Sequence, residues 1–194
     1  EINSVDDNPI VDVDNQKILH GGNFHGDYIS LEMDKLKIAI TKLTMLTERQ
    51  LNLLLNSKTN KILPPFLNIG KLGLNYGMQG VQFTATSTTA ESQMLSNPMS
   101  VHSITCNNDN QDIVSMGTNS ALITRKVIDN AFQVMSIQLI ACVKALEILK
   151  VTNQACNETK HTLDTVKELI GSNGVDDDVF YNKLKKIETY LRDN

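Results

Sequence analysis

The sequence has no tryptophan, only four prolines, and three cysteines among its 194 residues. Its cysteines are Cys106, Cys142 and Cys156. An odd number of cysteines without zinc-site spacing argues against a disulfide framework and favours a reducing compartment, so we expect a cytoplasmic protein. The four histidines also show no metal-ligand spacing. We therefore predict no metal site.

The sequence also lacks an excess of positive charge and a long apolar run. Its 18 basic and 22 acidic residues give a net charge of -4, which argues against a nucleic-acid binder that works by bulk electrostatics. No stretch approaches the roughly 18 continuous apolar residues of a membrane span, and no secretory signal pattern is visible. We expect neither nucleic acid nor a membrane as a partner. The first residue is Glu1 rather than methionine, which leads us to expect a fragment or a processed product.

The composition is that of a folded protein, with 41% hydrophobic and 21% charged residues. Apolar residues recurring at three- and four-residue steps predict long helices over about 27–56, 75–96 and 114–150. Residues 10–13 and 17–20 are predicted to pair as a small hairpin. The predicted fold class is all-α, a long-helix bundle with a short N-terminal β-hairpin and turn segment.

Turn and capping signals divide the chain into three predicted segments. Residues 1–26 hold the hairpin and a glycine-rich turn, residues 27–150 form the long-helix core, and residues 151–194 form amphipathic helices. Pro64 and Pro65, in Leu63-Pro64-Pro65-Phe66, are expected to end the first long helix. The break Gly171-Ser172-Asn173-Gly174 is expected to separate the last two helices, with Asp176-Asp177-Asp178 capping the second.

A long stretch carries almost no charge. Between Leu72 and Thr124 the only formal charges are Glu91, Asp109 and Asp112. A segment of this kind is usually buried, and its polar groups then need partners. One interpretation is a buried structural helix with satisfied serines and threonines. The other is a polar pocket or a subunit interface.

Two polar loops are candidate binding elements. Gly21-Gly22-Asn23-Phe24-His25-Gly26 lacks the Lys-Ser/Thr of a phosphate loop, so it is either a tight turn before a helix or a place where the backbone approaches a ligand closely. Asn107-Asn108-Asp109-Asn110-Gln111-Asp112 is rich in amides that both donate and accept hydrogen bonds. It is either a solvated loop in which Asp112 caps the next helix, or a wall for a zwitterionic ligand.

These loops carry a resemblance to the aromatic amino acid ammonia-lyases and aminomutases, which act on histidine, phenylalanine and tyrosine. The stretches that carry it are Asn3-Ser4-Val5-Asp6-Asp7-Asn8-Pro9, His20-Gly21-Gly22-Asn23-Phe24-His25-Gly26, Leu63-Pro64-Pro65-Phe66-Leu67, Gly73-Leu74-Asn75-Tyr76-Gly77, Ser96-Asn97-Pro98 and Asn110-Gln111-Asp112-Ile113-Val114-Ser115-Met116-Gly117. Their order is the family's order, and bacterial tyrosine-type lyases are the most similar members.

The resemblance implies a helical part of the lyase core and a homotetramer. It also implies an electrophilic methylidene-imidazolone (MIO) group, which the family forms from an internal Ala-Ser-Gly. This sequence contains no Ala-Ser-Gly, so it is expected to form no MIO and to be inactive alone. The family's catalytic tyrosine and Tyr…Arg substrate motif would lie upstream of Glu1. The chain therefore resembles the later part of such an enzyme.

The resemblance also assigns site residues. Asn8 matches an asparagine near the MIO, and Phe24 matches a phenylalanine beside the substrate. Gln111 and its neighbour Asn110 match a motif near the amino-acid end of the substrate, and Asn107 matches a variable pocket position. They are all predicted to lie close to the substrate and the MIO.

Gln111 bears on the choice of substrate. Histidine lyases carry a glutamate at the matching position, whereas phenylalanine and tyrosine lyases carry a glutamine. The implied activity is therefore non-oxidative elimination of ammonia from L-tyrosine or L-phenylalanine to give a cinnamate-type acid, which is p-coumarate for tyrosine. A histidine ammonia-lyase that forms urocanate, an MIO aminomutase, and a catalytically inert helical assembly module remain as alternatives.

Overall fold

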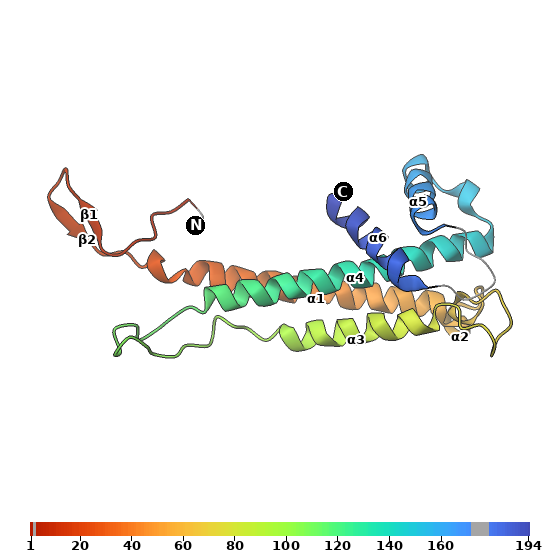
Figure 1. Cartoon of the computed structure of the whole chain (residues 1–194), viewed down its shortest axis with the longest axis horizontal. Coiled ribbons are helices and arrows are strands. Elements are labelled where there is room, and N and C mark those ends of the chain that lie inside the picture. Colours follow the sequence, from red (N-terminus) through yellow and green to blue (C-terminus); the bar gives the residue numbers. More distant parts are fainter. Residues whose placement is uncertain (2, 172–178) are drawn as a thin grey trace. The chain divides into compact units, whose positions relative to one another are not determined.

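The chain is built of helices joined by loops, with one small hairpin near its amino terminus (Figure 1). The computed structural model describes residue 1, residues 3–171 and residues 179–194. Its strands and α-helices in this part are β1 (Ile10–Asp12), β2 (Lys17–Leu19), α1 (Asp27–Leu55), α2 (Ser57–Asn60), α3 (Gln79–Leu95), α4 (Gly117–Leu149), α5 (Asn157–Ile170) and α6 (Phe180–Asp193). The predicted all-α class with an N-terminal hairpin is confirmed.

The hairpin is closed by local turn chemistry. Strands β1 and β2 are antiparallel, with Ile10 opposite Leu19 and Asp12 opposite Lys17. The Asp12 carboxylate accepts the side-chain amide of Asn15 at 2.8 Å and its backbone N–H at 3.1 Å. These bonds favour the ionised carboxylate and hold the pKa of Asp12 below its ordinary value. Because the residues of β2 are exposed, the turn rather than a core fixes this hairpin.

Helix α1 ends at Leu55, well before the two prolines that were expected to end it. The side chain of Asn56 caps the one-turn helix α2, and Asn60 at its end donates from Nδ2 to the carbonyl oxygen of Leu53 at 2.9 Å. Amide side chains thus satisfy groups at the end of α1 that have no partner within the helix. The expectation that the prolines terminate this helix is wrong.

Helices α3 and α4 agree with their predicted positions to within a few residues. Helix α4 is long and apolar enough to meet the length and composition criteria of a membrane-spanning helix. It also carries wholly buried core residues, including Val134, Ile137 and Ile140. A core helix of this kind satisfies the same criteria, and the expectation of no membrane partner stays a prediction.

The last two helices follow the predicted order. Helix α6 begins at Phe180, and Val179 rather than an aspartate occupies its N-cap position, without a side-chain cap. The aspartates expected to cap it, Asp176, Asp177 and Asp178, lie outside the described residues, as do residues 172–174 of the expected break. The buried face of the helix, which includes Leu184 and Ile187, packs into the core of unit 2.

The described chain divides into two compact units. Unit 1 comprises Glu1–Ile40 and Gln93–Ile128, and unit 2 comprises Thr41–Ser92 and Asp129–Asn194. Helices α1 and α4 contribute residues to both units. Each unit therefore joins segments that are far apart in the sequence, and the division into three consecutive segments stays a prediction.

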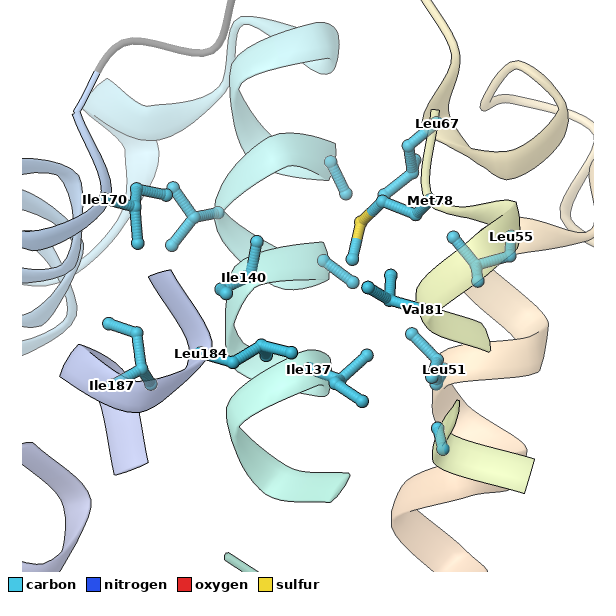
Figure 2. Close-up of a cluster of buried hydrophobic side chains, with 14 of the residues drawn as sticks. Leu51, Leu55, Leu67, Met78, Val81, Ile137, Ile140, Ile170, Leu184 and Ile187 are labelled. Carbon is cyan, nitrogen blue, oxygen red and sulfur yellow. The ribbon is translucent and has the colours of Figure 1, made fainter. Parts of the chain in front are cut away.

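Unit 2 contains a large apolar core, part of which is drawn in Figure 2. Ile137 of α4 faces Leu51 of α1, while Leu184 and Ile187 of α6 lie on the other side of α4. Full burial of a leucine or isoleucine side chain contributes about 1.5–3 kcal/mol. Burial of these side chains between helices is therefore the main source of stability in unit 2.

The charge-poor stretch is divided between a helix and a loop. In α3, the buried hydroxyl of Thr89 donates to the carbonyl of Ala85 at 2.8 Å, and buried Ser92 also bonds within the helix. This part agrees with the interpretation as a buried helix whose polar side chains find partners. Residues 101–110 are exposed instead, and for them the pocket or interface interpretation stays a prediction.

Candidate active site

Two loops of unit 1 carry four of the five residues predicted to line a site, and the fifth, Asn8, contacts one of these loops. We call residues 20–26 the Gly-Gly turn and residues 106–111 the amide loop. Loops on a rigid scaffold are common places for binding residues. The predicted site residues are Asn8, Phe24, Asn107, Asn110 and Gln111.

The Gly-Gly turn is held by Asn8 and leads directly into α1. Oδ1 of Asn8 accepts the backbone N–H of Gly21 at 3.2 Å, so the side chain of Asn8 lies against this turn. Phe24 lies in a single 3-10 turn, is 51% exposed, and meets the ring of His25 edge-on at 5.6 Å between centroids. Gly26, with φ of 65°, ends this turn in a conformation that favours glycine. The geometry agrees with a tight turn before a helix, and the role of Phe24 beside a substrate stays a prediction.

The amide loop is a tight backbone loop. The backbones of Cys106 and Gln111 exchange two hydrogen bonds, with N···O distances of 3.0 and 3.2 Å. Three consecutive residues between them have φ of 57°, 52° and 64°, in the left-handed region, and these are Asn107, Asn108 and Asp109. Asparagine and aspartate tolerate this region better than other side-chain-bearing residues. The composition of the loop thus has a conformational reason in addition to any role toward a ligand.

Asp112, which directly follows the amide loop, does not cap helix α4. This helix begins at Gly117, whereas Oδ1 of Asp112 accepts the backbone N–H of the next residue at 2.9 Å. Met116 has φ of 52°, so the backbone is not helical until Gly117. The interpretation in which Asp112 is the N-cap of the helix is therefore wrong. Gln111 is half-buried, while Asn107 and Asn110 are exposed.

Serine hydroxyls connect the Gly-Gly turn and α1 to the segment that follows the amide loop. The hydroxyl of Ser115 donates to the carbonyl oxygen of His25 in the Gly-Gly turn. In return, the hydroxyl of Ser30 on α1 donates to the carbonyl oxygen of Ser115 at 2.6 Å. The segment that follows Gln111 is therefore tied to the segment that holds Phe24, although about 90 residues separate them in sequence.

A buried ion pair lies on α1 beside these serines. Nζ of Lys37 is 2.6 Å from Oδ1 of Asp34, and both side chains are almost entirely buried. Oδ1 of Asp34 also accepts the hydroxyl of Ser120 at 2.8 Å, and Oδ2 accepts the backbone N–H of Ser100 at 2.7 Å. Burial opposes ionisation of Asp34, but the hydrogen bonds from Lys37 and Ser100 outweigh it and hold its pKa well below the ordinary value. Asp34 is therefore an anion that joins α1, α4 and the segment between them.

Sequence analysis did not single out Ser30, Asp34, Lys37 or Ser115. The available signal was general: a charge-poor stretch whose polar groups need partners. Asp34 and Lys37 are only three residues apart on α1, whereas the pairing of the serines could not be read from the sequence because their partners are 85 to 90 residues away. In the described part of the chain, no hydrogen bond links one of the five predicted site side chains to another, and no cluster of three metal-ligand side chains is present.

Comparison with known proteins decides the family. The family model for aromatic amino acid lyases matches residues 1–168. The chain belongs to this family. It is 38% identical over 170 residues to the tyrosine ammonia-lyase of Cupriavidus metallidurans, covering 88% of this chain and 32% of the relative. It is 43% identical over 150 residues to a histidine ammonia-lyase of Caldanaerobacter subterraneus, covering 77% of this chain and 29% of the relative.

Solved structures agree with this family assignment. The tyrosine aminomutase from Streptomyces globisporus superimposes with a TM-score of 0.92 at 35% identity, covering 98% of this chain and 36% of that structure. The chain thus spans about a third of the length of the lyase-family relatives it matches. Its long helices correspond to the helical core of these proteins, as the sequence predicted.

Proposed function

We propose that the whole protein containing these residues is an aromatic amino acid ammonia-lyase that converts L-tyrosine or L-phenylalanine to a cinnamate-type acid and ammonia. Family membership and the similarity to a tyrosine ammonia-lyase support this activity. The observation that carries it is the connection made by Ser115 between the Gly-Gly turn and the segment that follows Gln111. This contact holds two loops with predicted site residues in one compact unit.

The chemistry of the two loops suits a zwitterionic substrate and a neutral prosthetic group. Because Oδ1 of Asn8 accepts from Gly21, its Nδ2 remains available as a donor. Gln111 and Asn110 provide further neutral amides, and Phe24 provides an exposed apolar ring. Asn8 would hold the family's MIO through this Nδ2 donor, and MIO would supply the electrophile for the reaction. In our proposal, this chain's residues bind and orient the substrate.

The substrate preference is proposed from Gln111. A neutral amide beside the substrate carboxylate avoids repulsion, whereas it offers no charged partner to an imidazole ring. We propose phenylalanine or tyrosine as the substrate for this reason. Asn107, on the exposed side of the amide loop, is proposed to line the same pocket.

The activity is tested with the whole enzyme. L-tyrosine, L-phenylalanine and L-histidine are supplied separately, and the unsaturated acids are measured by their ultraviolet absorbance. We expect release of p-coumarate or cinnamate, with little urocanate. Urocanate as the main product would contradict the substrate choice, and no unsaturated acid would favour the inert assembly module.

Variants of Gln111 test its proposed role. Loss or misplacement of a buried hydrogen-bonding partner costs about 1–3 kcal/mol, or roughly 5- to 150-fold in specificity. We expect Gln111→Glu to lower kcat/KM for tyrosine and phenylalanine and to shift the ratio toward histidine. Gln111→Ala is the matched control and should lower kcat/KM for all substrates together. Unchanged substrate ratios with a lowered Tm in both variants would contradict a pocket role.

An aminomutase is the second candidate, because one relative of similar identity is an MIO-dependent tyrosine 2,3-aminomutase from Streptomyces globisporus, 39% identical over 176 residues. Such an enzyme would return the amine to the β-carbon. Chiral chromatography of the products distinguishes a β-amino acid from an unsaturated acid. The residues proposed here to contact the substrate would be the same in both cases.

We also propose that the whole protein is a cytoplasmic homotetramer that forms through its long helices. Helix α1 exposes several large apolar residues in unit 2, namely Leu43, Met45, Leu46 and Leu53. Exposed apolar patches of this kind commonly mark interfaces. Analytical ultracentrifugation at micromolar concentration should give a tetramer, and replacement of Leu46 by glutamate should shift it toward smaller species. A monodisperse wild-type monomer would contradict the proposal.

The 194 residues on their own should show no turnover. They contain no Ala-Ser-Gly from which MIO could form. We expect the purified chain to release no unsaturated acid from any of the three amino acids. Turnover by this chain would overturn the proposed dependence on MIO.

A further inference from the structure

We propose that Ser115 is a positioning residue of the active site, which acts by clamping the Gly-Gly turn to the segment that connects the amide loop to α4. The inference rests on the proposed function, because it concerns the loops that bear Phe24 and Gln111. Ser115 itself is 6% exposed and is proposed to touch neither substrate nor prosthetic group. Its hydroxyl donates a hydrogen bond, and its carbonyl oxygen accepts one.

The clamp has two hydrogen bonds. The Ser115 hydroxyl donates to the carbonyl oxygen of His25, the residue that follows Phe24. The Ser115 carbonyl accepts the hydroxyl of Ser30 at 2.6 Å, one turn into α1. The backbone at Ser115 is thereby fixed both to the Gly-Gly turn and to the helix that follows it.

The clamp is attached to a buried polar network formed by Ser30, Asp34, Lys37 and Ser120. The Ser120 hydroxyl on α4 lies 3.0 Å from the carbonyl oxygen of Ser30 and 2.8 Å from Oδ1 of Asp34. Asp34 is in turn paired with buried Lys37. Asp34 accepts hydrogen bonds at both of its carboxylate oxygens, and a displacement of Ser120 or Ser100 would leave a buried carboxylate oxygen with fewer partners. This network therefore holds α1 and α4 in register, and Ser115 links it to the Gly-Gly turn.

The backbone between Gln111 and α4 has no regular structure of its own to hold it. Met116 has φ of 52°, and Cys106 and Gln111 pair only with each other across the amide loop. The backbone N–H of Val114 donates to the hydroxyl of Ser103 at 3.0 Å, and Ser115 provides the side chain by which this segment reaches the Gly-Gly turn. A displacement of about 1 Å at a reacting centre can lower turnover by roughly 100-fold, so a positioning role has a measurable effect.

The test compares three variants of the whole enzyme. Ser115→Ala removes the hydroxyl that reaches His25, and Ser115→Thr restores a hydroxyl at the same position. Thr124→Val is the matched control: Thr124 is as deeply buried in unit 1, but its hydroxyl bonds only to the carbonyls of Met33 and Ser120 within α1 and α4, at 2.8 Å each. Measurements are kcat and KM, Tm, and hydrogen exchange at the backbone amides of Cys106 and Gln111.

We expect Ser115→Ala to lower kcat about ten-fold with a smaller change in KM, because binding groups remain but their alignment is lost. Amide exchange at Cys106 and Gln111 should rise about five-fold or more, since their protection depends on a held loop. Ser115→Thr should recover most of kcat. Thr124→Val should lower Tm about as much as Ser115→Ala does. Its kcat and its loop exchange should stay within about two-fold of wild type.

Two results would overturn the proposal. One is equal loss of kcat in Ser115→Ala and Thr124→Val, which would make Ser115 merely structural. The other is unchanged loop exchange in Ser115→Ala. If the wild-type enzyme forms no product from any aromatic amino acid, the proposed function fails, and loop exchange in the same variants still decides whether Ser115 clamps the loops.

Discussion

In unit 2 the wholly buried side chains are mostly leucine, isoleucine and valine, whereas in unit 1 they include Ser30, Lys37 and Ser120. Among the described residues of unit 1, Val127 is the one buried apolar side chain. The same two helices, α1 and α4, supply residues to both units. A single helix can therefore bury an apolar face over part of its length and a polar one over another part.

The difference separates two kinds of stabilisation. An apolar core is non-directional, so most of the stability of unit 2 comes from burial of apolar side chains, beside hydrogen-bonded polar residues such as Thr89 and Ser92. A buried polar centre depends on direction and on every partner being present, so unit 1 gains a defined geometry at the site. Unit 1 also exposes apolar side chains, such as Leu31, Val101 and Ile113.

The largest loss of stability is expected when the anion at the centre of unit 1 is removed. Asp34→Ala leaves the ammonium group of Lys37 buried without its carboxylate. Breaking a buried pair in this way costs about 3–5 kcal/mol of unfolding free energy. Urea unfolding measures the loss.

The double variant Asp34→Leu/Lys37→Met is the control for Asp34→Ala, because it removes both charges. It should recover most of the stability while loosening the loops. A loss below about 1 kcal/mol in Asp34→Ala would show that the ion pair does not hold unit 1 together.

The corresponding change in unit 2 removes apolar volume. Ile140 is wholly buried in the core of Figure 2, and Ile140→Ala is expected to lower the unfolding free energy by about 2–5 kcal/mol. Ile140→Val should cost about 0.5–1.5 kcal/mol. Activity per folded molecule should stay near wild type in both variants. A selective loss of kcat would contradict the assignment of function to unit 1.

The dependence of unfolding free energy on pH distinguishes the buried anion of unit 1 from the apolar core of unit 2. Because the pKa of Asp34 is lowered on folding, its ionised form contributes stability that is fully present above the ordinary aspartate pKa of about 4. That contribution is lost as the pH falls below this value and protons bind the unfolded chain first. Asp34→Asn should flatten the acid limb of a plot of unfolding free energy against pH, with Ile140→Val as a control that leaves its slope unchanged. Equal slopes in Asp34→Asn and wild type would contradict this role.

The smallest effect is expected at an exposed ion pair on the same helix. Lys35 lies 2.7 Å from Glu32, but both side chains are more than half exposed. Lys35→Ala should change the unfolding free energy by a few tenths of a kcal/mol, because solvent and salt screen such pairs. Urea unfolding of Lys35→Ala and of Asp34→Ala compares the loss of unfolding free energy at an exposed and at a buried ion pair on the same helix. A comparable loss in both would mean that burial does not set the strength of these pairs.

The sequence alone determined the elements and the family. Apolar spacing predicted α1, α3 and α4, because a helix must bury one face and the 3.6-residue period is local. Turn residues predicted the hairpin for the same local reason. The motifs around Asn8, Phe24 and Gln111 predicted membership of the aromatic amino acid lyases, which the family match confirms.

Only the tertiary structure decided which polar groups meet. The end of α1 lies within one residue of the predicted position, but the prolines were wrongly expected to cause it, because the amide of Asn60 reaches back to a carbonyl seven residues away, a contact that a proline rule does not contain. The links from Ser115 to His25 and from Ser120 to Asp34 join residues about 90 apart. Hydrogen bonds are short and directional, so a sequence predicts that buried serines need partners but not which ones, until packing of α1 against α4 brings them within reach.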